Sequence, residues 1–254
     1  MDHWKRVSPG RLPSILGRLN FRRIGEYSAL IRWLDPRPDE RILDIGAGDG
    51  YYDWQIAKSG AQITGIDVHE KRLAAARRYY QGARTEFFFM DASKLDFPDA
   101  SFDKAISLCV MEHLGDDDLV MRNISRALKP GGLFVFSADS LSNPEITPEE
   151  RDRHRRRYAV NTFYTHRNVR EKLARNGFDV LETGYLLSRR GDIRFVRLSW
   201  KLDELPGILK ILKTVGYAAL GTARKLSTLA PGRKSHSPEG GLTLLVKAVR
   251  RPSP

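Results

Sequence analysis

The chain contains one cysteine, Cys109, among 254 residues, and it contains no long apolar run. A single cysteine cannot form an internal disulfide, and no Cys and His spacing typical of a zinc site is present. The most apolar long stretch, 205–229, is interrupted by four Lys and Arg residues, so it does not match a membrane-spanning helix. The first residues do not resemble a secretory signal. We therefore expect a cytoplasmic protein, either free or peripheral to a membrane.

The net excess of positive charge lies entirely in the second part of the chain. Residues 1–149 contain 20 Lys and Arg against 22 Asp and Glu, whereas residues 150–254 contain 23 against 9. Such asymmetry favours an anionic partner, namely nucleic acid, an anionic membrane surface or an acidic substrate. A solvated, solubilising surface is the alternative interpretation.

Short apolar runs alternate with helical patterns between residues 41 and 137. The predicted strands cover 41–45, 62–67, 85–90, 104–108 and 133–137. The predicted helices cover 52–59, 70–81 and 116–128, and a Lys-Pro-Gly-Gly turn is predicted at 129–132. This alternation favours right-handed βαβ units in a mostly parallel, doubly wound sheet. With 41% hydrophobic residues the chain can bury one sizeable core, so we expect one α/β domain with insertions.

The pattern changes after residue 138. Thr165 predicts the N-cap of a helix that reaches Asn176, and Gly177 predicts its end. Two further strands are predicted, at 178–187 and 242–249. Two segments fall outside the repeating core and are predicted to be insertions, 139–164 and 188–241. Insertions in an α/β enzyme commonly determine its substrate specificity.

A glycine-rich segment, Asp44-Ile-Gly-Ala-Gly-Asp-Gly50, lies where the first strand meets the first helix. Doubly wound sheets bind nucleotides at this point, and glycines let a ligand approach the main chain closely. The glycines alone would also fit a dinucleotide enzyme or a simple tight turn. The spacing, however, is G-x-G-x-G after an acid, which differs from the pyrophosphate fingerprint G-x-G-x-x-G. A carboxylate here would repel a pyrophosphate, but it suits a ligand with an ammonium and a sulfonium group.

Two more acids stand at the ends of the next two strands. Asp67 is placed to accept hydrogen bonds from both hydroxyls of a ribose, which NAD would also offer. Asp91, followed by Ala92, is placed to accept from the exocyclic amine of an adenine. Each acid alone also has a structural interpretation, such as a cap at Asp91. Three acids at three successive strand ends favour one nucleoside-containing, positively charged cofactor.

The first half of the sequence resembles the class I S-adenosylmethionine-dependent methyltransferases, in the broad group that includes the ubiquinone and menaquinone C-methyltransferases. The matching segments occur in order over about residues 40–138, namely 42–50, 63–67, 90–92, 97–98, 101–103, 110–114 and 126–132. The resemblance weakens after residue 165 and is absent from the insertions. It implies S-adenosyl-L-methionine as the cofactor, methyl transfer as the reaction, and a sheet of six parallel strands and an antiparallel seventh.

The resemblance also implies which residues hold the cofactor. These residues are Asp44, Gly46, Ala47, Gly48, Asp67, Val68, Asp91, Ala92, Leu108 and Cys109. The glycines would lie against the amino-acid part of the cofactor, and Asp67 would bind the ribose with Val68 beside the adenine. Residues 1–39 would form a helical lid over the cofactor, on a methyltransferase domain of residues 40–254.

The remaining implied positions lie at the ends of the third and fourth strands. Asp91 and Ala92 would flank the amine edge of the adenine. Leu108 and Cys109 would line the cavity near the methionine part of the cofactor.

Methyl transfer needs an oriented nucleophile more than a strong acid or base. A general base helps where the acceptor is a hydroxyl or an acidic carbon. His113, after the fourth strand, is the predicted base, and a structural histidine at a helix start is the alternative. Further candidates are His154, Tyr158, Tyr164 and His166. The three adjacent acids 116–118 are expected to complement a helix dipole, and no metal is predicted.

The basic second half bears on the acceptor. Residues 205–229 predict a basic amphipathic helix that covers the core, contacts a partner, or lies on an anionic membrane with a lipid-like acceptor. Five arginines between 151 and 157, with aromatic residues behind them, would also suit RNA. Because no RNA-binding module or N-P-P-Y motif is found, a small-molecule, glycan or lipid-like acceptor is favoured over nucleic acid. An RNA methyltransferase and a non-catalytic cofactor-binding protein remain the alternatives, and no oligomeric state is predicted.

Overall fold

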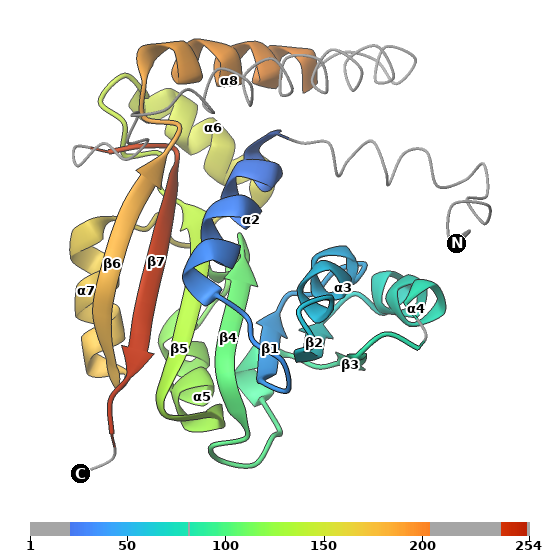
Figure 1. The fold of residues 1–254 in the computed structure, drawn as a ribbon. Coiled ribbons are helices and arrows are strands. Elements are labelled where there is room, and N and C mark those ends of the chain that lie inside the picture. Colours follow the sequence, from blue (N-terminus) through green and yellow to red (C-terminus); the bar gives the residue numbers. More distant parts are fainter. Residues whose placement is uncertain (1–20, 81, 204–239, 253–254) are drawn as a thin grey trace.

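The computed structural model describes residues 21–80, 82–203 and 240–252. Within them, seven strands form one sheet in the order β3-β2-β1-β4-β5-β7-β6 (Figure 1). The strands are β1 (Arg41–Ile45), β2 (Gln62–Asp67), β3 (Thr85–Phe89), β4 (Phe102–Leu108), β5 (Leu128–Asp139), β6 (Phe178–Leu186) and β7 (Thr243–Arg250). Strands β1 to β5 pair in parallel, and β7 is antiparallel to both β5 and β6. The predicted doubly wound α/β sheet is confirmed.

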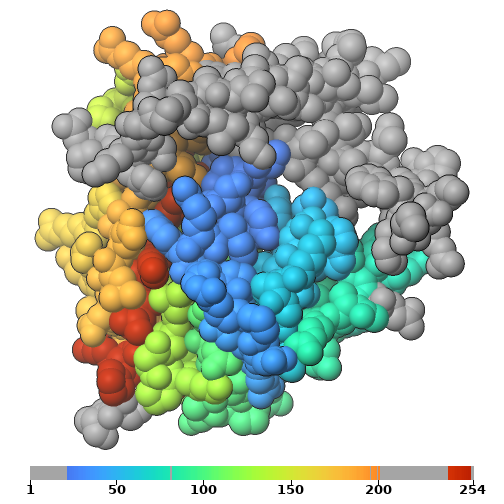
Figure 2. All heavy atoms as spheres, in the orientation of Figure 1, coloured from blue at the N-terminus to red at the C-terminus, as the bar shows by residue number. Residues whose placement is uncertain are grey.

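Helices cover both faces of the sheet. They are α2 (Phe21–Leu34), α3 (Tyr51–Ala57), α4 (Glu70–Tyr79), η3 (Ala92–Lys94), η4 (Met111–His113), α5 (Asp117–Ala127), α6 (Pro148–Tyr158), α7 (His166–Arg175) and α8 (Arg190–Asp203). Apolar residues of α5 and α7 pack on one face, and those of α2 and α3 pack on the other. In the space-filling view α2 covers the middle of one face, with α3 beside it (Figure 2).

The turn predicted at 129–132 lies inside β5, which is longer than the predicted strand 133–137. Its pairing with β4 shifts register between Phe102 and Lys104, and Gly131 has a φ of +76°. A proline has no N–H to donate, so a strand tolerates Pro130 only where the ladder is irregular. A Cβ atom at Gly132 would lie 2.7 Å from the carbonyl oxygen of Lys129, which explains this glycine.

The structure describes only part of the predicted lid and part of the predicted insertions. Residues 1–20 and 204–239 lie outside the described residues, and with them the helix predicted at 205–229. Within the predicted lid, α2 buries Ala29, Leu30 and Leu34 against the sheet. The first insertion contains α6 and the second begins with α8 (Figure 1). None of the described helices is both long enough and apolar enough to cross a membrane.

Candidate active site

The glycine segment between β1 and α3 is closely packed at one glycine and open at another. Gly46 has a φ of +86°, and a Cβ atom there would lie 2.3 Å from Val110 Cγ2. Gly48 has a φ of +59°, and a Cβ atom there would meet no described atom within 4 Å. The main chain at Gly48 therefore borders open space, where a ligand can approach it.

Asp67, at the carboxyl end of β2, lies directly beside this segment. Its Oδ2 accepts from Gly48 N at 2.8 Å, and its Oδ1 accepts from His69 N at 2.8 Å. An ionised carboxylate has about four lone-pair positions, so each oxygen keeps capacity for a further donor. The bond to Gly48 joins two predicted cofactor residues in one unit.

Asp44 has a buried carboxyl with an unused oxygen. Its Oδ1 has no hydrogen-bond partner among the described residues. Burial raises the pKa of Asp44 to about 7, although a hydrogen bond with Asp53 opposes this shift. A buried carboxyl without a cationic partner fits a ligand that brings a positive charge of its own.

The segment after β3 places Asp91 at the surface. Asp91 Oδ1 accepts from Ser93 N at 2.8 Å and caps η3, which lowers the pKa of Asp91. Ala92 is buried, whereas Val68 is 54% exposed and Phe89, the register partner of Asp67, is 61% exposed. Large apolar side chains exposed at this edge of the sheet suit a flat ring that covers them.

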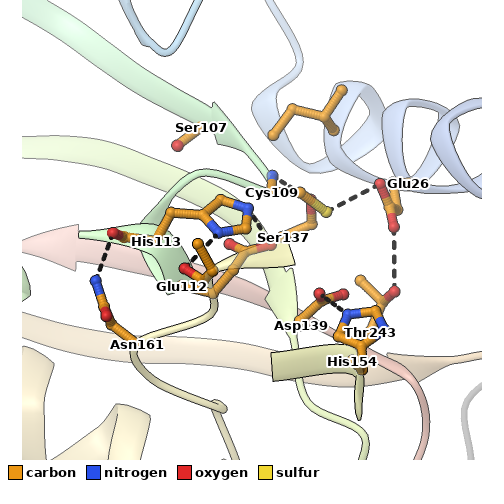
Figure 3. A network of polar contacts seen from close by, with 12 residues as sticks. Glu26, Ser107, Cys109, Glu112, His113, Ser137, Asp139, His154, Asn161 and Thr243 are labelled. Carbon is orange, nitrogen blue, oxygen red and sulfur yellow. Dashed lines mark hydrogen bonds and ion pairs between the residues drawn. The ribbon is translucent and has the colours of Figure 1, made fainter. Parts of the chain in front are cut away.

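The carboxyl end of β4 is covered by α2. Arg23 Nη1 donates to the carbonyl oxygen of Leu108 at 3.1 Å and to Glu26 Oε2 at 3.3 Å. Cys109 has a φ of +50°, its N donates to Ser137 Oγ at 3.1 Å, and its Sγ donates to Glu26 Oε2 at 3.2 Å (Figure 3). Burial raises the pKa of the Cys109 thiol, which favours its neutral form.

The carboxyl end of β5 carries a buried acid and histidine pair (Figure 3). Asp139 Oδ1 accepts from Arg22 Nη2 at 2.9 Å, and Asp139 Oδ2 lies 2.6 Å from His154 Nε2. Burial opposes ionisation of Asp139, but the His154 hydrogen bond and the Arg22 charge outweigh it and lower the pKa of Asp139 to about 2. In a neutral imidazole this bond keeps the proton on Nε2 and leaves a lone pair on Nδ1.

The second nitrogen of this histidine has no partner in the described part of the chain. His154 Nδ1 is buried and has no hydrogen-bond partner among the described residues. The imidazole lies among aromatic rings, with centroids 4.6 Å from Tyr158, 5.7 Å from Trp200 and 6.3 Å from Phe163. An imidazole held by a carboxylate at one nitrogen and free at the other has the arrangement of a general base.

His113 lies in η4 and is partly exposed (Figure 3). Its Nδ1 lies 3.3 Å from the carbonyl oxygen of Ala159, and its own carbonyl oxygen accepts from Asn161 Nδ2 at 2.7 Å. Glu112 beside it is buried, and burial with the nearby Asp139 charge raises the pKa of Glu112 to about 8. His113 therefore links the segment after α6 to the end of β4 through these two contacts. Its role as a general base stays a prediction.

The acids at 116–118 begin α5. Asp116 Oδ1 accepts from Leu119 N at 2.9 Å as the N-cap, and Asp118 accepts from Arg175 Nε at 2.7 Å. Asp117 accepts from Lys172 Nζ at 2.6 Å and from the hydroxyl of Tyr164. Helix capping and cross-links to α7 use these carboxylates.

Sequence reasoning assigned no role to Arg22, Arg23, Glu26 or Asp53. Three of these residues come from α2, which the resemblance predicted only as part of a lid. The pairing of Asp139 with His154 was also missed, although Asp139 ends a parallel strand at the expected edge, which is a usable signal.

Comparison with known proteins identifies the family. A methyltransferase domain model matches residues 43–136. The chain is 30% identical over 200 residues to the O-methyltransferase resE of Aspergillus sclerotiorum, covering 73% of this chain and 76% of that protein. It is 35% identical over 101 residues to a ubiquinone biosynthesis O-methyltransferase of Idiomarina loihiensis, covering 39% and 42%. An S-adenosylmethionine-dependent methyltransferase from Mesorhizobium loti shares the fold, with a TM-score of 0.61, 23% identity and coverage of 88% and 96%.

The chain belongs to the class I S-adenosylmethionine-dependent methyltransferases. This methyltransferase uses S-adenosyl-L-methionine as its cofactor and a small molecule as its acceptor. The predicted family, fold class, reaction and cofactor are confirmed.

Proposed function

We propose that this methyltransferase methylates a hydroxyl group of a small molecule, with His154 as the general base. The observation that carries the proposal is the buried pair of His154 and Asp139, joined at 2.6 Å, with His154 Nδ1 free of partners among the described residues. The relatives from Aspergillus sclerotiorum and Idiomarina loihiensis are O-methyltransferases, which supports a hydroxyl as the acceptor group.

The chemistry assigns a step to each residue of the pair. A hydroxyl is a weak nucleophile until its proton is removed. In this scheme the acceptor hydroxyl donates to His154 Nδ1, which takes the proton as the oxygen attacks. Asp139 stabilises the imidazolium that forms, and Arg22 keeps Asp139 ionised and oriented. When bound, S-adenosyl-L-methionine supplies an electrophilic methyl group on a sulfonium.

The residues predicted to hold the cofactor fit it in this structure. Open space at Gly48 accommodates the amino-acid part, and the remaining lone pairs of Asp67 accommodate the ribose hydroxyls. The free oxygen of Asp44 accommodates an ammonium group. Val68 offers an exposed apolar surface beside the adenine position. Asp91, Ala92, Leu108 and Cys109 complete the proposed site, with Gly46 and Ala47 in the loop.

The surroundings of His154 bear on the acceptor class. Three aromatic rings around the imidazole favour an acceptor with an apolar or aromatic body. A cleft of about 420 Å³ runs beside α6 and is lined by Ile146, Pro148, Arg151, Asp152 and Arg155. Its two guanidinium groups suit an anionic group, including that of a lipid-like acceptor, although Asp152 also lines the cleft and His154 does not. Contact of residues 205–229 with an anionic membrane stays a prediction.

An acceptor screen tests the proposed function. The protein is incubated with methyl-labelled cofactor and a total lipid extract, a polar metabolite extract or RNA in separate pools. We expect label in an alkali-stable ether of a small molecule. Label in RNA, or on nitrogen or carbon atoms only, would contradict the proposal. Calorimetry with S-adenosyl-L-methionine and S-adenosyl-L-homocysteine runs beside the screen, and failure of both to bind would reject the proposed cofactor site.

Two glycine variants separate packing from binding. Gly46→Ala places a methyl group against Val110 and should lower the free energy of unfolding by about 2 to 4 kcal/mol, through overpacking and positive φ. Gly48→Ala meets no described atom, so it should cost about 1 kcal/mol of stability and weaken cofactor binding instead. Denaturant unfolding and calorimetry measure the two effects. If both variants lost the same free energy of unfolding and Gly48→Ala bound the cofactor as tightly as the wild type, the assignment of Gly48 to the cofactor site would be contradicted.

A further inference from the structure

Two arginines of the cleft beside α6 have no acidic partner in the described part of the chain. Arg151 and Arg155 both line this cleft of about 420 Å³. They are four residues apart, so their side chains lie on one face of the helix. Within the described residues their hydrogen bonds go to main-chain carbonyl oxygens, from Arg151 to Leu141 and from Arg155 Nη1 to Asn161 at 3.4 Å, and no salt bridge joins either to an acid.

Both guanidinium groups lie over one aromatic ring. The Cζ atoms of Arg151 and Arg155 are 5.6 and 5.0 Å from the centroid of Phe163. A guanidinium has five N–H donors, and one bond to a carbonyl leaves four on each group. Stacking on a ring holds the planar groups in place before a ligand arrives, so less freedom is lost on binding. Two such groups side by side match an anion that offers several oxygens.

The acids of α6 are engaged by other cations. Asp152, which also lines the cleft, accepts from Arg156 Nη1. Glu150 accepts from Arg197 Nε at 2.6 Å. The negative charges of this part of α6 are therefore offset by other arginines, and the two arginines of the cleft keep their positive charge for a ligand.

The cleft borders the proposed general base. Helix α6 lies beyond the carboxyl end of β5 (Figure 1). His154 follows Arg151 by three residues, which makes the two side chains neighbours on the helix surface. His154 does not line the cleft, but its ring centroid is 6.3 Å from that of Phe163, the ring beneath the guanidinium groups. One small molecule that covers Phe163 can therefore present a hydroxyl to the imidazole and an anionic group to the arginines.

We propose that this cleft is a subsite for a phosphate group of the acceptor, held by Arg151 and Arg155 above Phe163. A phosphate monoester offers three oxygens and between one and two negative charges, which suits two adjacent guanidinium groups better than the single charge of a carboxylate does. The inference rests on the proposed function and adds to it the group by which the acceptor is recognised. The phosphate can belong to a soluble monoester or to a lipid headgroup.

Calorimetry with phenyl phosphate at low salt tests the subsite, with benzoate as the matched carboxylate. We expect phenyl phosphate to bind at least about fivefold more tightly than benzoate. Arg155→Gln should weaken phenyl phosphate binding by about fivefold to tenfold, through the loss of charged hydrogen bonds. Arg155 is chosen because it is exposed, so its loss should not impair folding.

Two variants on the same helix are the controls. Arg153→Gln removes an exposed arginine that does not line the cleft, and it should leave Kd within about twofold. Asp152→Asn removes the one carboxylate of the lining, and it should tighten binding. Absence of phenyl phosphate binding would overturn the proposal. So would an equal loss in Arg153→Gln and Arg155→Gln, because that result would indicate a general effect of surface charge.

Vesicle flotation distinguishes the two sources of phosphate. Phosphatidylcholine vesicles with and without phosphatidic acid are compared at low salt. If phosphatidic acid recruits the wild type and Arg153→Gln but not Arg155→Gln, the phosphate is that of a lipid headgroup. If flotation is the same for all three proteins while phenyl phosphate binding depends on Arg155, the phosphate is that of a soluble monoester.

Kinetics with the acceptor from the screen separate this inference from the proposed function. Arg155→Gln should raise KM for the acceptor by at least about fivefold and leave kcat nearly unchanged, whereas His154→Gln should lower kcat. An unchanged KM in Arg155→Gln, or an acceptor without phosphate, would overturn the subsite and leave hydroxyl methylation in place. Phenyl phosphate binding without methyl transfer by the wild type would reject the proposed function and the link to the acceptor.

Discussion

Replacing His154 by Gln is expected to lower kcat by about 10² to 10⁴-fold, the range that a positioned general base contributes. Glutamine preserves a hydrogen bond to Asp139 but cannot take a proton from the acceptor. The rate is measured as label transferred from methyl-labelled cofactor to the acceptor pool identified by the screen. Cofactor affinity, measured by calorimetry, should stay within about threefold, because none of the proposed cofactor residues contacts the His154 ring nitrogens.

The matched variant is His113→Gln, which tests the base predicted from sequence. His113 is partly exposed, and the Ala159 carbonyl lies within hydrogen-bond distance of its Nδ1. We expect a loss of kcat below about fivefold, with some loss of stability from the loosened segment after α6. A large loss of kcat in His113→Gln together with a small loss of kcat in His154→Gln would make His113 the general base instead of His154. Asp139→Asn should follow His154→Gln, since it removes the charge that stabilises the imidazolium.

The cofactor half of the site was predictable because its residues follow one another closely in sequence. The segment from Asp44 to Gly50 fixes a strand, a tight loop and a helix start in seven positions. Asp67 and Asp91 could be placed at the same edge because parallel strands connected by right-handed crossovers end together. The bond between Asp67 and Gly48 could not be predicted, since it depends on the exact path of the loop.

The acceptor half was predicted incompletely because it is assembled from distant segments. Arg22 and Asp139 are 117 positions apart in sequence, and no periodic pattern links them. His154 stood among several candidate bases, and only the path of the insertion brings it to Asp139. Asp53 was given no role, because burial of that face of α3 could not be inferred from the seven residues of the helix.

Replacing Asp67 by Ala is expected to cost about 1.5 to 3 kcal/mol of cofactor binding, the range for hydrogen bonds to a charged group. That range corresponds to a Kd about 10-fold to 160-fold weaker. The loss has two sources, because Asp67 would accept from the ribose hydroxyls and already holds Gly48 N. Calorimetry with S-adenosyl-L-homocysteine measures it, and circular dichroism checks the fold.

Two further variants separate a specific contact from a general effect of negative charge. Asp99→Ala removes an exposed carboxylate that pairs with Arg126, and it should leave Kd unchanged because exposed ion pairs contribute little. Asp91→Ala removes the cap of η3 and the proposed partner of the adenine amine, and its loss should be smaller than that of Asp67→Ala because Asp91 is solvent-exposed. An Asp67→Ala variant with wild-type affinity would remove Asp67 from the site. Equal losses in all three variants would instead indicate long-range electrostatics, since only Asp67 both bonds to the loop and is buried at its edge.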